Sequence, residues 1–592
     1  MTLTQWLPFV ETARRYEWKA FRADALAGLA GAIMVVPQCI AYAMIAGLPP
    51  IYGFYSAIVV ATVGALMGSS EHLICGPTNS IAIVIATAIA HSSLVAVKEN
   101  PAEAVLLLAF MVGVIQFAFG VSKLGNLSQF VSRSVVVGFT AGAGLLIALN
   151  QLNPLLGLDP PPGEPVLQQF RFAVRQIAEF NPYSLAIGAG SLALMLLGSR
   201  WLPRWLTPLV VVSLAAAAVW AFRLDEKGVA LVGQVPNEPP MLRSPRWSLG
   251  MMTDLADSAL AIAILGCIET LSIAKGIGAA SGQRVDANQG FIGVGLANIA
   301  AAFFQSMPGS GSFVRSALNH QVGGRTRFAA VTGAVWVAGI LFVFAPLVSY
   351  VPNAALAGML IVLGLGMFQW HNIRVALHAT RSDAVVLIMT FAVAVLVNLR
   401  VAIYVGVISS LALFLRKASA PHLVEYDFDG ETMREISNPS ERSHPEISII
   451  HVEGELFFGA AELFQDEVRR VAEDKNIQVV ILRMKNARNL DATAVMALED
   501  LLKFLVSSGR LLLISGASSD VIGVLRRSGL LDLLGEECVF EAEGNLTAAT
   551  RKALIRAQQF LGKAVTPEVR VFYDKSHVEQ QPPPPQRDTP EA

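Results

Sequence analysis

Two stretches decide the fold: Ile74-Cys75-Gly76-Pro77-Thr78-Asn79-Ser80 and Met307-Pro308-Gly309-Ser310-Gly311-Ser312-Phe313-Val314-Arg315-Ser316. Each puts Pro, Gly and small hydroxyl residues inside a long hydrophobic region, just before a short segment that can form a helix. Unwound backbone is tolerated at membrane depth only where it is buried in protein or lines a cavity. Short helices broken by Gly or Pro, in matching halves of a chain, indicate the binding site of a secondary transporter.

The composition indicates a polytopic membrane protein. Of the 592 residues, 54% are hydrophobic and only 15% are charged, and the mean hydropathy is +0.54. Soluble domains carry roughly a quarter charged residues. The formal net charge is −1, so we expect no nucleic acid partner. The four cysteines form no Cys-x-x-Cys pair and are expected to be reduced structural thiols.

Fourteen apolar segments are candidates to cross a bilayer, which takes about 20 residues of helix. They lie near residues 24–46, 51–68, 74–91, 102–121, 130–150, 183–199, 205–222, 252–275, 287–304, 311–321, 327–349, 353–369, 383–398 and 401–415. The two interrupted segments are the third and the tenth, seven apart. This spacing predicts two repeats of seven, and repeats with an odd number of segments insert in opposite orientations.

Basic residues predict the orientation, because short cytoplasmic loops are enriched in Lys and Arg. With the N-terminus inside, the six inner loops contain Lys123 and Arg133, Arg200 and Arg204, Lys275 and Arg284, Arg325 and Arg327, Arg374 and Arg381, and Arg416 and Lys417. We therefore expect a multi-pass protein of the cell (inner) membrane with both termini in the cytoplasm. The first 24 residues lack an apolar core, so no signal peptide is expected.

The pattern changes after residue 445. Strand patterns at 447–452, 479–484 and 511–515 alternate with helical patterns, which predicts a small cytoplasmic α/β domain. The expected organisation is a cytoplasmic N-terminal segment (1–23), a membrane domain (24–418), a linker (419–444), the α/β domain (445–560) and a disordered, proline-containing tail (561–592).

Four motifs, in order, resemble the SulP (sulfate permease) family of anion transporters. They are Pro37-Gln38 with Ala41-Tyr42-Ala43 and Ala46-Gly47-Leu48-Pro49-Pro50, then Gly68-Ser69-Ser70-Glu71-His72-Leu73-Ile74-Cys75-Gly76-Pro77, Val285-Asp286-Ala287-Asn288-Gln289-Gly290, and Gly311-Ser312-Phe313-Val314-Arg315-Ser316-Ala317. The later region resembles the family's C-terminal STAS domain, including Asn489-Leu490-Asp491-Ala492-Thr493.

The resemblance implies a fold class of 14 transmembrane segments in two inverted seven-segment repeats, split into a moving core and a scaffold called the gate. It also implies a small anion between the half-helices of segments three and ten, a homodimer in membrane lipid, and an elevator mechanism. The sequence contains no Walker A or GxSxG motif and no metal-ligand spacing. We therefore expect a transporter, not an enzyme, with no cofactor and no metal.

Free backbone N–H groups at the starts of the half-helices are expected to attract the anion. The candidate substrate-binding residues there are Thr78 and Asn79 on the first, and Ser312, Phe313, Val314 and Arg315 on the second. A simple Gly-Pro kink is the alternative for either break alone. Many sulfate-transporting relatives have Ser at the position of Val314, so bicarbonate, chloride and dicarboxylates stay open beside sulfate.

Gln38 and Tyr42 are four residues apart on the first segment and share a helix face. The resemblance places both on the wall of the anion cavity. The alternative is a hydrogen bond between packed helices.

Glu269 is a lone carboxylate in an apolar segment, which makes it a functional candidate by default. We expect it to be the proton-coupling residue; sodium is the other possible coupling ion, although relatives coupled to sodium tend to have Asp here. The alternative is a structural ion pair with Arg315.

In the STAS-like region, Thr493 lies where related bacterial domains have a phosphorylated Ser, so it is a possible regulatory site, although helix capping by Asp491 explains the motif more simply. For the whole chain the favoured function is proton-coupled sulfate uptake. The alternatives are a bicarbonate or dicarboxylate transporter, an uncoupled anion exchanger or channel, and a STAS-based membrane sensor.

Overall fold

The structure is a computed structural model that describes residues 7–125, 132–159, 166–198, 200–203, 205–233, 238–418, 422–428, 433–436, 442–456, 458–488, 490–543 and 547–562. The chain divides into two compact units, Met1–Leu411 and Ala412–Ala592. Most of the tail that was predicted to be disordered, and parts of the predicted linker, lie outside the described residues.

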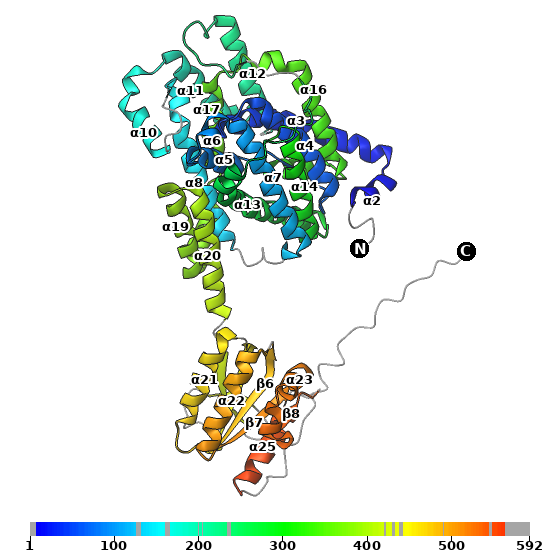
Figure 1. The fold of residues 1–592 in the computed structure, drawn as a ribbon, viewed down its shortest axis with the longest axis vertical. Helices are drawn as coiled ribbons and strands as arrows, with labels where there is room; N and C mark the ends of the chain where they lie inside the picture. Colours follow the sequence, from blue (N-terminus) through cyan, green and yellow to red (C-terminus); the bar gives the residue numbers. More distant parts are fainter. Residues whose placement is uncertain are drawn as a thin grey trace, which may run out of the picture. The chain divides into compact units, whose positions relative to one another are not determined.

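The first unit is helical apart from two very short strands (Figure 1). Its elements are α2 (Phe9–Arg14), α3 (Trp18–Ile45), α4 (Pro50–Met67), β1 (Cys75–Gly76), α5 (Asn79–Ala90), α6 (Val95–Glu99), α7 (Pro101–Val121), α8 (Arg133–Asn150), α9 (Leu152–Leu156), α10 (Val166–Arg175), η2 (Ile177–Glu179), α11 (Pro182–Gly198), α12 (Thr207–Phe222), α13 (Leu249–Ser281), α14 (Ala287–Phe303), β2 (Ser310–Gly311), α15 (Phe313–Val322), α16 (Phe328–Val348), α17 (Asn353–Gly366), α18 (Trp370–Ala379), α19 (Arg381–Leu396) and α20 (Leu399–Ala418).

Each of the fourteen predicted segments corresponds to one helix, which confirms the predicted fold class. Among the described residues, eight helices are long and apolar enough to cross a membrane, and α5, α11 and α12 are shorter apolar helices. The two interrupted segments form the short helices α5 and α15, of 12 and 10 residues, each preceded by a two-residue strand.

Packing partners repeat when the chain is shifted by seven segments. Helix α7 packs against α13 and α14, and its counterpart α16 packs against α3 and α4. In the same way the fifth segment, α8, packs against the thirteenth, α19, and their counterparts, the twelfth (α17) and the sixth (α11), pack against each other. The counterpart strands β1 and β2 pair with each other in antiparallel orientation. These paired contacts are what two inverted repeats of seven segments require.

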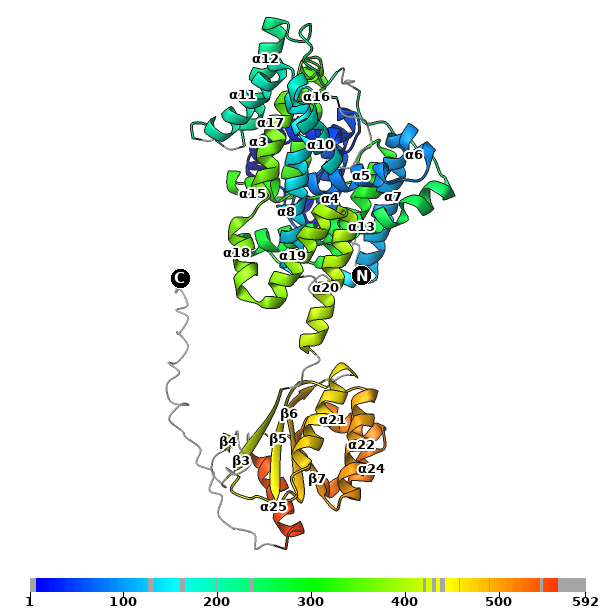
Figure 2. The same cartoon turned by 90° about the vertical axis from the view of Figure 1, so that its left-hand side faces the viewer.

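The first four segments of each repeat form one group, which is the core of the transporter fold. The remaining segments form the gate, in which α8 lies beside α17 and α19 (Figure 2). Small residues let core helices approach closely, as is usual in membranes. A Cβ atom on Gly113 of α7 would lie 2.5 Å from the backbone nitrogen of Ile299, and one on Gly295 of α14 would lie 2.5 Å from that of Phe117.

Asp24, a fully buried carboxylate near the start of α3, ties the chain start to the loop before α16. It accepts hydrogen bonds from the backbone N–H groups of Arg325 and Thr326 at 2.7 and 3.1 Å. It also accepts from the hydroxyls of Thr326 and Tyr16 at 2.6 and 3.1 Å. The two repeats are therefore joined here by one carboxylate.

We expect Asp24→Ala to lower the thermal unfolding midpoint of the purified protein clearly. The change would leave two backbone donors without their acceptor, at a cost of about 1–3 kcal/mol each. Tryptophan fluorescence during heating in detergent measures it, with the exposed Asp225→Ala as the matched control. Equal midpoints for the two variants would contradict this role.

The second unit is an α/β domain with a six-stranded sheet in the order β4-β3-β5-β6-β7-β8. The strands β5 to β8 are parallel, and β3 and β4 are antiparallel additions at one edge. The elements are β3 (His422–Phe428), β4 (Met433–Glu435), β5 (Ile447–Glu455), α21 (Phe458–Ala472), β6 (Val479–Arg488), α22 (Ala492–Ser507), β7 (Leu511–Ala517), α23 (Ser519–Arg527), α24 (Leu530–Leu534), η4 (Glu536–Cys538), β8 (Val539–Glu541) and α25 (Ala548–Phe560).

The sheet is covered on both faces, with α21 and α22 on one face and α25 on the other. It begins earlier than the sequence pattern suggests, because β3 and β4 lie in the segment predicted to be a linker. Arg442 holds this edge by pairing with Glu425 at 2.8 Å and with Asp474 at 2.7 Å. The backbone N–H of Asn476, and then Arg442, keep the pKa of the Asp474 carboxyl below its usual value.

Candidate functional site

The two breaks meet at one place. Cys75 pairs with Gly311 and Gly76 with Ser310, so β1 and β2 form a minimal antiparallel sheet. The backbone N–H of Ser312 also donates to the carbonyl of Ile74 at 2.9 Å. The starts of α5 and α15, which are more than 230 positions apart in the sequence, are thereby brought side by side. We call this region, residues 75–80 and 310–315, the cradle.

Both half-helices begin without a side-chain cap. Thr78 precedes α5 and Ser312 precedes α15, both with extended backbone, yet neither side chain accepts a hydrogen bond from its own helix. The first N–H groups of a helix have no partner within the helix and carry a partial positive charge. Two such ends in one cradle are suited to an anion.

Buried amides hold the second break in shape. Asn298 of α14 accepts from the N–H of Gly309 at 2.8 Å and donates to the carbonyl of Gly309 at 3.0 Å. It also donates to Gln116 of α7 at 2.8 Å, and Gln116 donates to the carbonyl of Ala263 at 3.3 Å. The hydroxyl of Thr270 accepts from the N–H of Gly311 at 3.0 Å. These contacts satisfy unwound backbone that has no water to bind.

Sequence reasoning missed Asn298, Gln116 and Ser310. The signal was present for two of them, because Gln116 is the lone amide of its apolar segment, as Gln38 is, and Asn298 is flanked on both sides by apolar residues and glycine. A buried amide inside a membrane helix needs a partner, and the same rule that selected Gln38 selects them.

Glu269 of α13 reaches the cradle through hydroxyl groups. Its carboxylate accepts from the hydroxyl of Ser310 at 2.7 Å, and it is also hydrogen-bonded to Ser80. The expected alternative, an ion pair with Arg315, is not formed within 4.0 Å. The carboxylate thus lies between the two breaks without a cationic partner.

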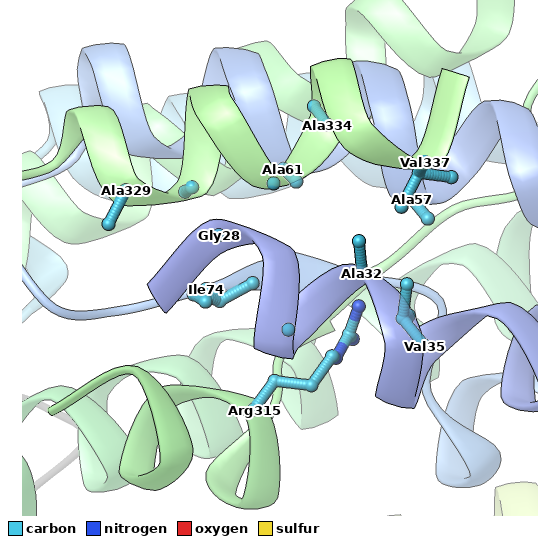
Figure 3. A pocket seen from close by; sticks show the side chains of 13 residues that line it. Gly28, Ala32, Val35, Ala57, Ala61, Ile74, Arg315, Ala329, Ala334 and Val337 are labelled. Atoms are coloured by element: carbon cyan, nitrogen blue, oxygen red, sulfur yellow. The ribbon is translucent and has the colours of Figure 1, made fainter. Parts of the chain in front are cut away.

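Arg315 places its charge against the first break. Its side chain is almost fully buried and donates from Nη2 to the carbonyl of Pro77 at 2.9 Å. Figure 3 shows Arg315 beside a cavity that is lined mainly by small residues of α3, α4 and α16, including Gly28, Ala32, Ala57 and Ala334. The guanidinium therefore adds positive charge to the backbone between the two half-helices.

The side chains of the other candidate residues differ in burial and in the elements they contact. Gln38 and Tyr42 are buried on α3, which packs against α5 and α15. Asn79 is buried and donates to the sulfur of Met367, which follows α17 in the gate, at 3.1 Å. Phe313 and Val314 expose 62% and 54% of their surface. The backbone N–H groups of these two residues lie at the start of α15 and belong to the cradle.

In the α/β domain, Asp491 acts as a double cap. Its Oδ1 accepts from the N–H of Ala494 at 2.9 Å, and its Oδ2 accepts from the N–H of Phe458 at 2.7 Å. These bonds join the starts of α22 and α21. Thr493 is exposed in the first turn of α22.

The comparisons with known proteins agree with this geometry. The model of the "Sulfate permease family" matches residues 21–390, and that of the "STAS domain" matches residues 438–548. The chain belongs to the sulfate permease family. It is an anion transporter of that family with a C-terminal STAS domain, and not an enzyme.

Relatives match over nearly their whole length. The "Probable sulfate transporter MT1781" of Mycobacterium tuberculosis (strain CDC 1551 / Oshkosh) is 30% identical over 550 residues, which cover 91% of this chain and 97% of the relative. The "Putative sulfate transporter YvdB" of Bacillus subtilis (strain 168) is 28% identical over 536 residues, covering 90% and 98%. The fold is similar to that of the murine Slc26a9 anion transporter in the inward-facing state, with a TM-score of 0.83 at 20% identity, covering 94% of each chain.

We expect Gly76→Ala to reduce anion uptake by about tenfold or more. Gly76 has φ +145°, and an added Cβ atom would lie 2.6 Å from Nη1 of Arg315, so the guanidinium would have to leave Pro77. Uptake of radiolabelled sulfate into proteoliposomes measures the effect. Gly31→Ala, at the same cavity but with free space for a Cβ atom, is the control, and equal loss in both variants would contradict the expectation.

We expect Asp491→Ala to destabilise the starts of α21 and α22 by about 1–2 kcal/mol, the usual effect of losing a helix cap. The exposed Thr493→Ala should change stability by no more than about 0.5 kcal/mol. Amide hydrogen exchange in the first turns of both helices, in the full-length protein, measures this. Equally faster exchange in both variants would assign Thr493 a structural role.

Proposed function

We propose that this protein takes up a small inorganic anion, with sulfate as the leading substrate, and that a proton moves with it. The observation that supports this most directly is the position of Glu269. Among the described residues this carboxylate has no cationic partner, and it is hydrogen-bonded to Ser80 in the first turn of α5 and to Ser310 of β2, the strand that precedes α15. Its protonation changes the charge of the cradle by one unit, which ties proton binding to anion binding.

The proposed binding residues are Gln38, Tyr42, Thr78, Asn79, Ser312, Phe313, Val314 and Arg315. The half-helix starts and Arg315 provide the attraction, and Phe313 and Val314 act through their backbone. Val314 offers no hydroxyl, which favours keeping bicarbonate and dicarboxylates among the substrates to be tested.

We further propose an elevator mechanism, in which the core carries the cradle past the gate. The hydrogen bonds that pair β1 with β2 and those that hold the second break run between core elements, so the cradle can move with the core. Core and gate share a cluster of buried apolar residues, and a few polar contacts also join them. Asn79 contacts Met367, and Arg400 of α20 binds Asp257 and Ser258 of α13 at 3.2 and 3.1 Å.

The proposed setting is the cell (inner) membrane, with both termini in the cytoplasm and the transporter assembled as a homodimer. The basic inner loops support this orientation. The proposed organisation into N-terminal segment, membrane domain, linker, STAS domain and tail follows the sequence boundaries, with Thr493 as a possible regulatory site.

We expect Glu269→Gln to abolish uphill sulfate uptake driven by an inward proton gradient, while sulfate exchange across equal solutions persists. The neutral amide keeps the hydrogen bond with Ser310 but cannot lose a proton. Uptake into proteoliposomes with and without pH and sodium gradients, with sulfate, bicarbonate and a dicarboxylate, is the measurement.

Two results would overturn the proposal. Uphill uptake that survives in the Glu269→Gln variant would exclude proton coupling through this residue. Chloride-dependent current without saturable uptake in the unaltered protein would favour a channel instead.

A further inference from the structure

A chain of hydroxyl groups joins Glu269 to the start of α5. The hydroxyl of Ser310 lies 2.7 Å from Oε2 of Glu269 and 3.1 Å from the hydroxyl of Thr78. Ser310 is fully buried. Thr78 occupies the capping position of α5 but makes no capping bond, so its side chain is engaged with Ser310 instead of with its own helix. The proposed function gives Ser310 no role.

The direction of these hydrogen bonds depends on the proton of Glu269. An ionised carboxylate only accepts hydrogen bonds, and each hydroxyl has one hydrogen to donate. Ser310 therefore donates to the ionised Glu269. The bond between Ser310 and Thr78 can then form only if Thr78 donates. Thr78 in this state has no hydrogen left for an anion, and its lone pairs are its free hydrogen-bonding groups.

Protonation of Glu269 allows the reverse direction. The protonated carboxyl donates to Ser310, Ser310 donates to Thr78, and the hydrogen of Thr78 becomes free. A hydroxyl at the start of α5 then adds a donor to the N–H groups of that helix. Both directions use the same atoms at the same distances.

We propose that Ser310 couples the proton on Glu269 to anion binding by reversing this chain, so that Thr78 donates to the anion only when Glu269 is protonated. This inference rests on the proposed function and adds a residue and a mechanism to it. The ligand class is a small anion that accepts hydrogen bonds. One proton binds to Glu269 from water and later leaves the same carboxylate, while each hydroxyl keeps its own hydrogen and only rotates.

The charged surroundings of Glu269 do not supply a competing partner among the described residues. The elements packed against α13 here are α5, α7, α14, α15 and β2. The sequences of α5 and β2 contain no titratable residue, and α7 and α14 present the neutral amides of Gln116 and Asn298.

The charged groups on these elements are engaged elsewhere. Arg315 binds the carbonyl of Pro77 and has Cys39, Tyr42 and Cys75 as its electrostatic neighbours. Glu103 of α7 pairs with Arg243, and His320 of α15 lies against His72. Ser80 is the remaining polar contact of Glu269.

The test is the pH dependence of the KM for inorganic sulfate in proteoliposomes. In the unaltered protein we expect KM to rise about tenfold or more as the pH rises and Glu269 loses its proton, since a hydrogen bond to a charged group is worth roughly tenfold in affinity or more. Ser310→Ala and Thr78→Val both reduce this dependence to the part that the charge of Glu269 itself causes, but they shift KM in opposite directions. Ser310→Ala leaves the Thr78 hydroxyl free to donate, so KM at high pH falls below that of the unaltered protein, whereas Thr78→Val removes the donor, so KM at low pH rises above it.

Matched variants separate this mechanism from simple damage. Thr78→Ser keeps the hydroxyl and should retain the full pH dependence of KM, which Thr78→Val reduces. Ser80→Ala removes a contact of Glu269 that is not part of the hydroxyl chain from Ser310 to Thr78. It should move the midpoint of the pH dependence without reducing its size. If Ser310→Ala does not fold, the pair of Thr78 variants decides the question alone.

The outcomes are distinguishable. If the unaltered protein shows no proton-driven sulfate uptake, the proposed function fails. If it does, and both Ser310→Ala and Thr78→Val keep the full size of the pH dependence of KM, or both shift KM in the same direction, the proposed function stands and the hydroxyl chain is wrong.

Discussion

The pairing of β1 with β2 is the constraint on which the rest of the membrane unit depends. Two breaks in the middle of apolar segments expose backbone groups that lipid cannot satisfy. The two breaks satisfy some of these backbone groups by pairing with each other, Cys75 with Gly311 and Gly76 with Ser310. The solution requires the two repeats to insert in opposite orientations, because only then do equivalent strands meet in antiparallel fashion. It also leaves two uncapped helix starts next to each other, so the feature that makes the fold possible also creates the proposed anion site.

Most of the hydrogen bonds that hold this site in shape come from uncharged side chains. Asn298, Gln116 and Thr270 satisfy the second break without adding charge. Charged side chains in the same place would have added a permanent charge beside the cradle. The two ionisable groups nearest the breaks, Glu269 and Arg315, are kept apart and contact different partners. A permanent ion pair between them would have stabilised the ionised form of Glu269 and opposed its protonation.

The sequence alone predicts the number of segments and the two repeats, because apolar length, Gly-Pro interruptions and their spacing can be read directly from it, whereas the meeting of the two breaks was implied by the resemblance to the family. It also predicts that Glu269 is unusual. It does not predict the partners of Glu269, because hydrogen bonds such as that to Ser310 depend on where two distant segments pack. For the same reason the ion pair with Arg315 was a reasonable expectation that the structure does not contain. The early start of the sheet at β3 was missed because its strands join the edge of a domain whose pattern is clear only from Ile447.

The charge of the cradle bears on which anion such a site handles best. With Glu269 ionised, its charge and that of Arg315 cancel, and the remaining attraction comes from helix ends and hydrogen bonds. With Glu269 protonated, the site is positive by one unit. Coulomb energy scales with the product of the charges, so the same proton changes the attraction for a dianion about twice as much as for a monovalent anion. A site of this kind gains most from protonation when the transported anion is doubly charged, which is a physical argument for sulfate or a dicarboxylate over bicarbonate or chloride that does not depend on a hydroxyl at position 314.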